Sequence, residues 1–322
     1  MTDLMDLQGE FFQRLRTQGK SKNTLKNYKT DLDCFNNFIE KATSTRDVSK
    51  FNTSDIMDYG THLENKYQSQ NSRRRRVQAL RMFFDFLVER SVFPNNPVRK
   101  IPTSPKFLDI PRPTPLVDTK TLWLYLLTEG KNGQNLMGLT AKRNQVITLL
   151  IFGGGLKVSD LAVLKREHIV LGDTPRVIVK PEKRDPYSVE LPKTFNAVYQ
   201  NYIETLEVCK RDSNIDFDDV LFSANPYKIL SGGLSPRGLE IIFEDLRHKL
   251  LITLTPKSLR QGCIFKWLHQ KRGETLIKEW MGVAPSYSLK LYREHMESHP
   301  YHDTFIEENY NDVMSTAKTA LN

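Results

Sequence analysis

The apolar residues near the start of the chain recur at the spacing of amphipathic helices. In residues 21–43 they share one helical face, and Ser21 precedes them as a suitable N-cap; the face consists of Leu25, Tyr28, Leu32, Phe35 and Phe38. A second helix is predicted to open at Thr53 or Ser54 and a third at Ser72, each followed by an apolar stripe. The pattern therefore predicts a small helical domain.

A proline-rich stretch interrupts this pattern. Seven prolines lie between Phe93 and Pro115, and proline breaks both helices and central strands. We therefore predict a helical domain at 1–100, a basic linker at 101–116, a second domain at 117–295 and a tail at 296–322.

The second domain is predicted to be mostly helical with a small sheet. Glycines 153–155 should end an apolar helix, and residues 175–180 and 187–192 read as two strands around a polar turn. Helical patterns return in five later segments, at 194–208, 236–250, 256–269, 273–280 and 286–296. The predicted fold class is mainly α with a small β-sheet, in two domains.

Composition and charge narrow the class of protein. The net charge is +9, and residues 1–105 hold 18 basic against 12 acidic residues, so most of the excess lies in the first third. A basic domain favours a polyanionic partner such as DNA. No apolar run approaches the ~20 residues of a membrane span, and the N-terminus lacks the features of a secretory signal. We expect a cytoplasmic protein.

Neither the cysteines nor the histidines are spaced as metal ligands. The three cysteines lie far apart, at Cys34, Cys209 and Cys263, and the seven histidines show no zinc spacing. We expect reduced, packed thiols and no bound metal.

A run of four arginines marks the start of the third predicted helix. Arginine forks match phosphate oxygens, which favours DNA backbone contacts, while a solvated charged face is the alternative interpretation. The predicted DNA contacts in this domain are Arg73, Arg74, Arg75, Arg76, Arg81, Lys22 and Lys26.

Six segments resemble the tyrosine recombinase (phage integrase and Xer) family. In the first domain they are SKNTLKNYKTDLDCFNNFI and SRRRRVQALRMFFDFLVERSVFPNNPVRKI. In the second domain FGGGLKVSDLAVLKREHI is similar to the box of the first catalytic arginine, and RVIVKPEKRDPYSVELP to the hairpin of the catalytic lysine. LTPKSLRQGCIFKWL and WMGVAPSYSLKLY resemble the boxes of the second arginine and of the nucleophilic tyrosine. The order and spacing match over about residues 8–295.

The resemblance implies DNA strand transfer through a phosphotyrosine link, without metal or cofactor. It assigns the nucleophile position to Tyr292, the general-acid position to Lys180 with Lys183 as a rival, and the second arginine to Arg260. The remaining family positions differ, because Lys157 stands at the first arginine, Lys257 at a histidine, and Val283 at a histidine or tryptophan.

These differences should weaken catalysis more than binding. Arginine grips two phosphate oxygens in a planar fork, whereas lysine is a point charge on a flexible stem. Losing one transition-state donor costs on the order of 3–4 kcal/mol. Binding should survive, since the cations at Lys157, Lys180, Lys183, Lys257 and Arg260 still neutralise DNA phosphates.

The sequence therefore favours a sequence-specific binder of double-stranded DNA. We expect it to hold duplex DNA with both domains and to act as a transcriptional regulator, such as a repressor, of a prophage or mobile element. An active site-specific recombinase that uses Tyr292 is the first alternative, and an accessory DNA-architectural factor is the second. The tail, 296–322, is predicted to dock on another copy, to pack in cis or to fray.

Overall fold

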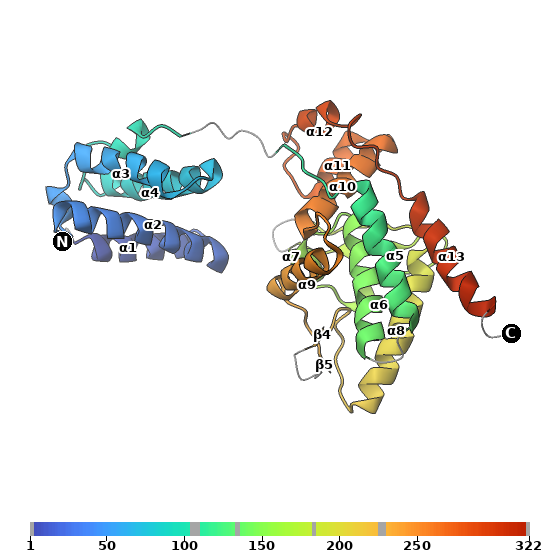
Figure 1. Cartoon of the computed structure of the whole chain (residues 1–322). Coiled ribbons are helices and arrows are strands. Elements are labelled where there is room, and N and C mark those ends of the chain that lie inside the picture. The colour runs from blue at the N-terminus through green and yellow to red at the C-terminus, as the bar shows by residue number, and fades with distance from the viewer. Residues whose placement is uncertain (1–2, 104–109, 133–135, 182–184, 225–229, 320–322) are drawn as a thin grey trace. The chain divides into compact units, whose positions relative to one another are not determined.

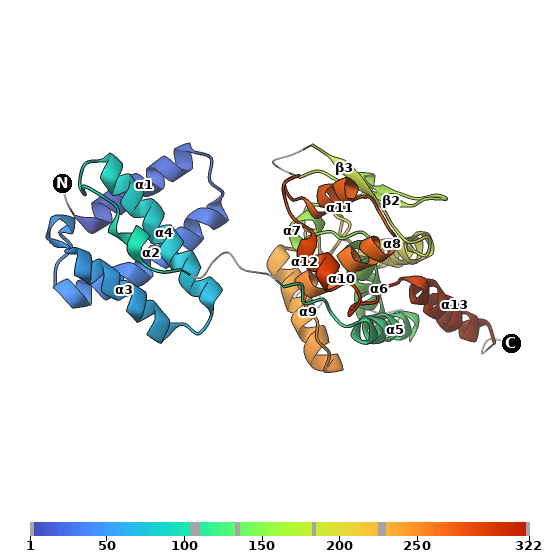
Figure 2. The same cartoon turned by 90° about the horizontal axis from the view of Figure 1, so that it is seen from above.

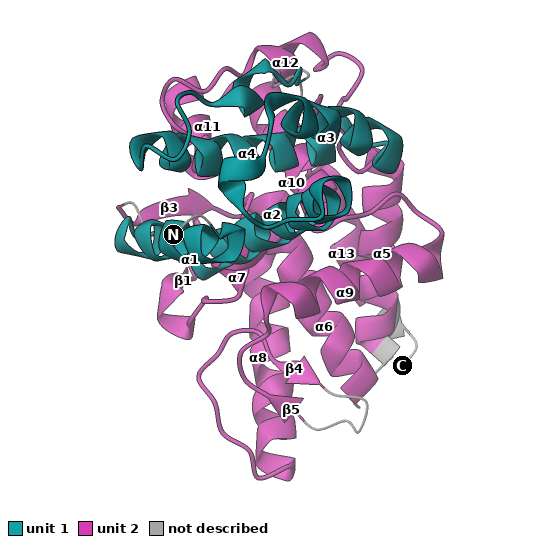
Figure 3. Ribbon diagram, turned by 90° about the vertical axis from the view of Figure 1, so that its left-hand side faces the viewer, with its two compact units in different colours: residues 1–108 teal, residues 109–322 magenta. Residues whose placement is uncertain are grey.

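The chain folds into two compact units. A computed structural model describes residues 3–103, 110–132, 136–181, 185–224 and 230–319. The N-terminal unit is Met1–Leu108 and the C-terminal unit is Asp109–Asn322 (Figure 3). As predicted, the architecture is mainly α-helical with small sheets. Within the described ranges, no helix is long and apolar enough to cross a membrane.

The N-terminal unit packs its helices around one apolar core. The described elements are α1 (Leu4–Thr17), α2 (Lys22–Thr43), η1 (Val48–Lys50), α3 (Thr53–Lys66), α4 (Gln70–Glu89) and η2 (Pro97–Lys100). The predicted face of α2 supplies Leu32 and Phe35 to this core, and both are fully buried. Phe35 meets Tyr59 of α3 and Phe84 of α4 edge to face, so aromatic contacts join the three helices.

Helix starts in this unit depend on side-chain caps, some of which differ from the predicted ones. Ser21 caps α2 as expected. α3 begins at Thr53, one of the two predicted positions, and its cap is Asn52, which exchanges hydrogen bonds with Asp55. The cap of α4 is Ser69 rather than Ser72, because the Ser69 Oγ accepts the Ser72 N–H and the helix begins at Gln70. The pattern did not predict α1.

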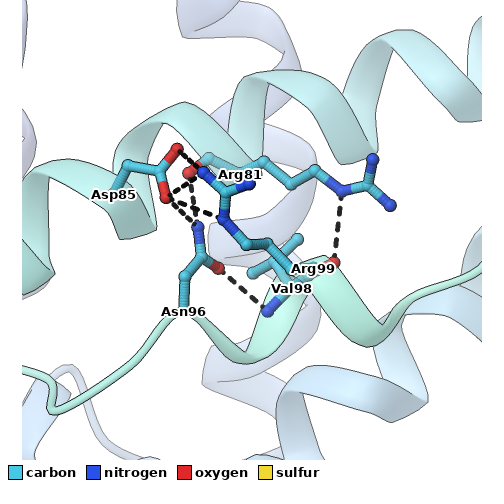
Figure 4. A network of polar contacts seen from close by, with 5 residues as sticks. All are labelled: Arg81, Asp85, Asn96, Val98 and Arg99. Atoms are coloured by element: carbon cyan, nitrogen blue, oxygen red, sulfur yellow. Dashed lines mark hydrogen bonds and ion pairs between the residues drawn. The ribbon is translucent and has the colours of Figure 1, made fainter.

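The chain leaves the N-terminal unit through a fixed turn. Asn96 Nδ2 donates to the Arg81 carbonyl and to Asp85 Oδ1, while Asn96 Oδ1 accepts the Val98 N–H (Figure 4). Arg99 donates to both carboxylate oxygens of Asp85. This network holds η2 against α4.

The C-terminal unit is larger and mainly helical. Its described helices and turns are α5 (Leu116–Asn132), α6 (Leu136–Thr148), the π-helical η3 (Leu149–Gly153), α7 (Val158–Leu161), η4 (Arg166–His168), α8 (Phe195–Asp212), α9 (Pro236–Leu250), α10 (Pro256–His269), α11 (Glu274–Met281), α12 (Lys290–Glu294) and α13 (Thr304–Thr319). The segment predicted as a helix at 286–296 is helical only in α12, which is five residues long. The core gathers apolar side chains from α5, α6, η3, α8, α9 and α10.

The predicted pair of strands is part of a three-stranded antiparallel sheet. β2 (Arg176–Val179) lies between β1 (Ile169–Val170) and β3 (Tyr187–Glu190), with Val177 opposite Val189. Figure 2 shows α11 beside this sheet, where Trp280 Nε1 donates to the Ser188 carbonyl at 3.0 Å. A second sheet, β4 (Ser223–Ala224) with β5 (Leu230–Ser231), was not predicted.

The tail packs in cis on its own unit. α13 runs beside α5 (Figure 1) and buries Phe305 and Ile306. Trp123 Nε1 of α5 donates to the Ile306 carbonyl at 3.1 Å. Of the three predicted arrangements for the tail, the structure contains the cis one.

Candidate functional site

The glycine run forms a tight turn that three side chains of α10 hold in place. Gly155 has φ +66°, and a Cβ there would lie 2.3 Å from the Trp267 ring. Arg260 Nε donates to the Gly155 carbonyl. Lys266 Nζ and Cys263 Sγ both donate to the Gly153 carbonyl, at 3.0 and 3.5 Å. The backbone just before Lys157 is therefore fixed from α10, and η3 adds a π-helical turn, a feature frequent at functional sites.

Lys157 is the N-cap residue of α7. Its backbone N–H donates to Asp160 Oδ2 at 3.0 Å, so Asp160 fixes the start of the helix that carries Lys157. Sequence reasoning missed Asp160. The available signal was an acidic residue three positions after the helix start, which is the spacing of a capping box.

Arg260 links the glycine turn to the end of α11. Besides Gly155, it donates through Nη2 to the Met281 carbonyl at 2.8 Å. Burial lowers the pKa of the Arg260 guanidinium, and Tyr292 and Asp160 lie close enough to act on that pKa in the opposite direction. The Arg260 side chain is thus held by backbone carbonyls on two sides.

Tyr292 lies in α12 against the same helix. Its side chain is buried, and its ring centroid is 5.3 Å from that of Phe265 of α10. Lys257 lies in the first turn of α10, one turn before Arg260, and is exposed. Val283, just after α11, packs against the apolar core of the unit.

Lys180 follows β2 and forms an ion pair. Its Nζ lies 3.3 Å from Glu167 Oε1, and the same carboxylate oxygen is 3.4 Å from His168 Nε2. Burial and the neighbouring Lys180 ammonium lower the pKa of His168. Its Nδ1 accepts the Lys165 N–H, which places the ring proton on Nε2, toward Glu167.

Lys180 and Asp160 both line a small cavity of about 130 Å³. Asp160 is the residue that accepts the backbone N–H of Lys157. Arg260 thus bonds the glycine turn that precedes Lys157, Lys180 shares a cavity with Asp160, and Tyr292 packs on Phe265 of α10. Whether these side chains act together stays a prediction. Lys183 lies outside the described residues. No group of metal-ligating side chains is present among the described residues.

The predicted DNA contacts of the N-terminal unit have varied surroundings. Lys22 and Lys26 are exposed on α2. Arg73 and Arg74 line an open groove of about 590 Å³ between α3 and α4. Arg81 donates to the carbonyls of Val98 and Ile101, which is a structural task at the chain exit. Contact of these residues with DNA stays a prediction.

The sequence and the fold are similar to those of known proteins. Residues 9–91 match the family described as phage integrase, N-terminal SAM-like domain. A tyrosine recombinase XerD of Listeria monocytogenes is 24% identical over 279 residues, which cover 85% of this chain and 89% of the relative. Another XerD, from Rhizobium meliloti, is 24% identical over 328 residues and covers 99% of both chains.

Over most of its length the chain is similar to tyrosine recombinases at 24% identity, and residues 9–91 match the phage integrase N-terminal domain. The fold agrees. A lambda integrase (75–356) dimer bound to a COC′ core site aligns with a TM-score of 0.62 at 16% identity, over 87% of this chain and 94% of that one. The aligned fold thus extends over both units. The relatives named here are recombinases, whereas this chain carries Lys157, Lys257 and Val283 at three of the positions where the resemblance places phosphate donors.

Proposed function

We propose that this protein is a sequence-specific binder of double-stranded DNA that regulates transcription in a prophage or mobile element and does not exchange strands. The proposal treats the tyrosine recombinase scaffold as a DNA-recognition device. Both units would contribute cations to the DNA backbone.

The composition of the site around Arg260 carries the proposal. Positions 157, 180 and 257 are lysines, and their positive charges favour binding to DNA phosphates. Val283, however, packs against the core and has no hydrogen-bond donor to offer a transition state. Lys157 adds a second loss, since its single ammonium cannot reproduce the planar fork of arginine. Each lost donor costs on the order of 10²–10³ in rate.

The retention of Arg260 is compatible with a protein that does not exchange strands. Its Nε and Nη2 both donate to backbone carbonyls. Because those bonds hold the glycine turn and the end of α11 together, this arginine has a structural task in addition to any contact with a phosphate.

An active recombinase is the second candidate function. Two observations favour it: the relatives at 24% identity are named tyrosine recombinases, and Tyr292 packs against α10, the helix that carries Arg260. In this alternative, Lys180 would serve as general acid once a phosphate replaces Glu167 as its partner.

Self-association through the tail belongs to the proposal as well. Because α13 packs on α5 in cis, docking on another copy would require it to leave this position.

Mapping the binding sites of the protein across its host genome tests the proposal. We expect several related sites that overlap promoters, and altered transcription from those promoters when the gene is deleted. A single site, or a pair at the ends of a mobile element, would instead support the recombinase.

A further inference from the structure

A buried carboxylate lies beneath the arginine run. The Asp31 side chain on α2 has 0% exposure and shares its helix face with Leu32 and Phe35 of the core. Burying a charge is unfavourable unless partners compensate it. The partners of Asp31 are successive residues of the arginine run on α4.

Arg75 and Arg76 approach the same oxygen of Asp31. Arg75 Nη2 donates to Asp31 Oδ1 at 2.9 Å, and Arg76 Nε lies 4.0 Å from that oxygen. Arg76 is nearly buried, lies 3.9 Å above the centroid of the Tyr67 ring and donates to the Ser72 carbonyl. Arg76 is therefore fixed by packing, cation–π contact and a backbone bond.

Arg75 differs from Arg76 because it reaches the surface. Its side chain is 48% exposed, although one of its nitrogens is bonded to a fully buried carboxylate. A guanidinium has five N–H donors, and the bond to Asp31 Oδ1 uses one of them. This bond orients the whole planar fork, since the fork is rigid. The bond to Asp31 therefore holds the exposed guanidinium of Arg75 in one orientation.

Packing alone does not explain why a carboxylate occupies this position. Asp31 Oδ2 and Arg76 Nε have no hydrogen-bond partner within the described residues. Burial raises the pKa of Asp31 in spite of the two arginines. An apolar residue of similar size at position 31 would avoid this unfavourable burial.

We infer that Asp31 is a positioning residue that holds Arg75 in the orientation in which it contacts a DNA phosphate. The inference rests on the proposed DNA binding and adds the residue that prepares one contact. It predicts an effect opposite to simple electrostatics. Removing a negative charge near a DNA-binding face ordinarily strengthens binding, whereas loss of a positioning carboxylate weakens it.

The test compares Asp31→Asn with wild type in binding a short random-sequence DNA duplex between about 50 and 200 mM KCl. We expect affinity about tenfold weaker, the size of one charge-assisted hydrogen bond, and a slope of log K against log[salt] reduced by about one. A merely structural role would change the melting temperature without changing this slope. Circular dichroism of each variant checks the fold.

The matched control is Glu10→Gln. This carboxylate also pairs with an exposed arginine, Arg90, but at the opposite end of α4 from Arg75. We expect its affinity to be unchanged or slightly stronger, with the slope of wild type.

Arg75→Gln and the double variant complete the design. If Asp31 acts through Arg75, the double variant binds as Arg75→Gln does, because the two changes remove one contact. An unchanged slope in Arg75→Gln overturns the inference even if Asp31→Asn proves unstable. So does Asp31→Asn binding as tightly as wild type. If wild type itself does not bind the duplex, the proposed function fails first, and that result is distinct from the others.

Discussion

At the scale of single residues, the chemistry of the site depends on donor geometry rather than on charge alone. Lys157 keeps the positive charge of the first arginine position, and its backbone is fixed by Asp160 at 3.0 Å. What it lacks is a planar pair of donors for two phosphate oxygens. The Val283 side chain has no donor at all. Under the proposed function, binding and catalysis are therefore separable at these two positions.

Restoring the donors should restore strand cleavage. We expect little covalent protein–DNA adduct from wild type on a nicked duplex of its own site, and about 10²-fold more from Lys157→Arg combined with Val283→His. Denaturing gels measure the adduct, and Tyr292→Phe in the same background is the control that should abolish it. If wild type forms abundant adduct and Tyr292→Phe forms none, the protein is an active recombinase.

Spacing along the sequence located the residues of the site only in part. The positions of Tyr292, Arg260 and Lys157 follow from motifs read directly from the chain. In the structure Arg260 contacts the turn that precedes Lys157 and Tyr292 packs on the helix of Arg260, while the roles of all three stay a prediction. Glu167 and Lys266 could not be found this way. Each acts through a partner distant in sequence, Lys180 for Glu167 and Gly153 for Lys266, so no local pattern identifies them.

At the scale of elements, the glycine turn and α10 form one assembly. Arg260, Cys263 and Lys266 project toward the turn at three-residue spacing, which places them along one side of α10. Trp267 closes the turn, because its ring lies where a side chain at Gly155 would be. Lys266 also lies 3.2 Å from Asp303, just before α13, so the tail is joined to the same assembly.

Gly155→Ala should therefore destabilise the C-terminal unit. The new Cβ meets Trp267 at 2.3 Å and the backbone has φ +66°. Gly19→Ala is the matched control, since Gly19 has φ +70° but no atom within 4 Å of a new Cβ. Overpacking should cost Gly155→Ala about 1–3 kcal/mol of unfolding free energy beyond the control. Urea titration measures the unfolding free energy of both variants. Equal losses of unfolding free energy would contradict the role assigned to Trp267.

Long elements were predictable and short ones were not. The stripes of α2, α4 and α9 each continue over several turns, so periodicity identified them. β1, β4 and β5 have two residues each, too few to show alternation. α12 is shorter than predicted, since the segment from Gly282 to Leu289 is not helical. Tertiary contacts, and not propensity, decide such pieces.

At the scale of the whole molecule, each unit has its own core. The buried cluster of the N-terminal unit includes Phe35, Tyr59 and Phe84, whereas that of the C-terminal unit includes Phe195 and Phe265. The division between Leu108 and Asp109 lies within the proline-rich stretch. The domain limits read from the sequence stay a prediction, which unfolding experiments can test.

Calorimetry should resolve two unfolding transitions in the free protein. Phe35→Ala removes a fully buried ring and should cost the N-terminal unit about 3–5 kcal/mol. Its transition should fall by roughly 10 °C or more, while the other stays in place. Phe195→Ala is the reciprocal control, with the effect confined to the C-terminal unit. A single transition that both changes lower together would contradict separate cores.

The bonds of Arg260 have a consequence for how such a protein can diverge. A lineage that no longer needs strand transfer is released from selection on the donors at positions 157 and 283. It is not released at position 260, because the carbonyls of Gly155 and Met281 depend on the same guanidinium. An arginine that survives in a drifting active site is therefore poor evidence of surviving activity. Better evidence of activity in other chains comes from residues whose only role is to contact the phosphate.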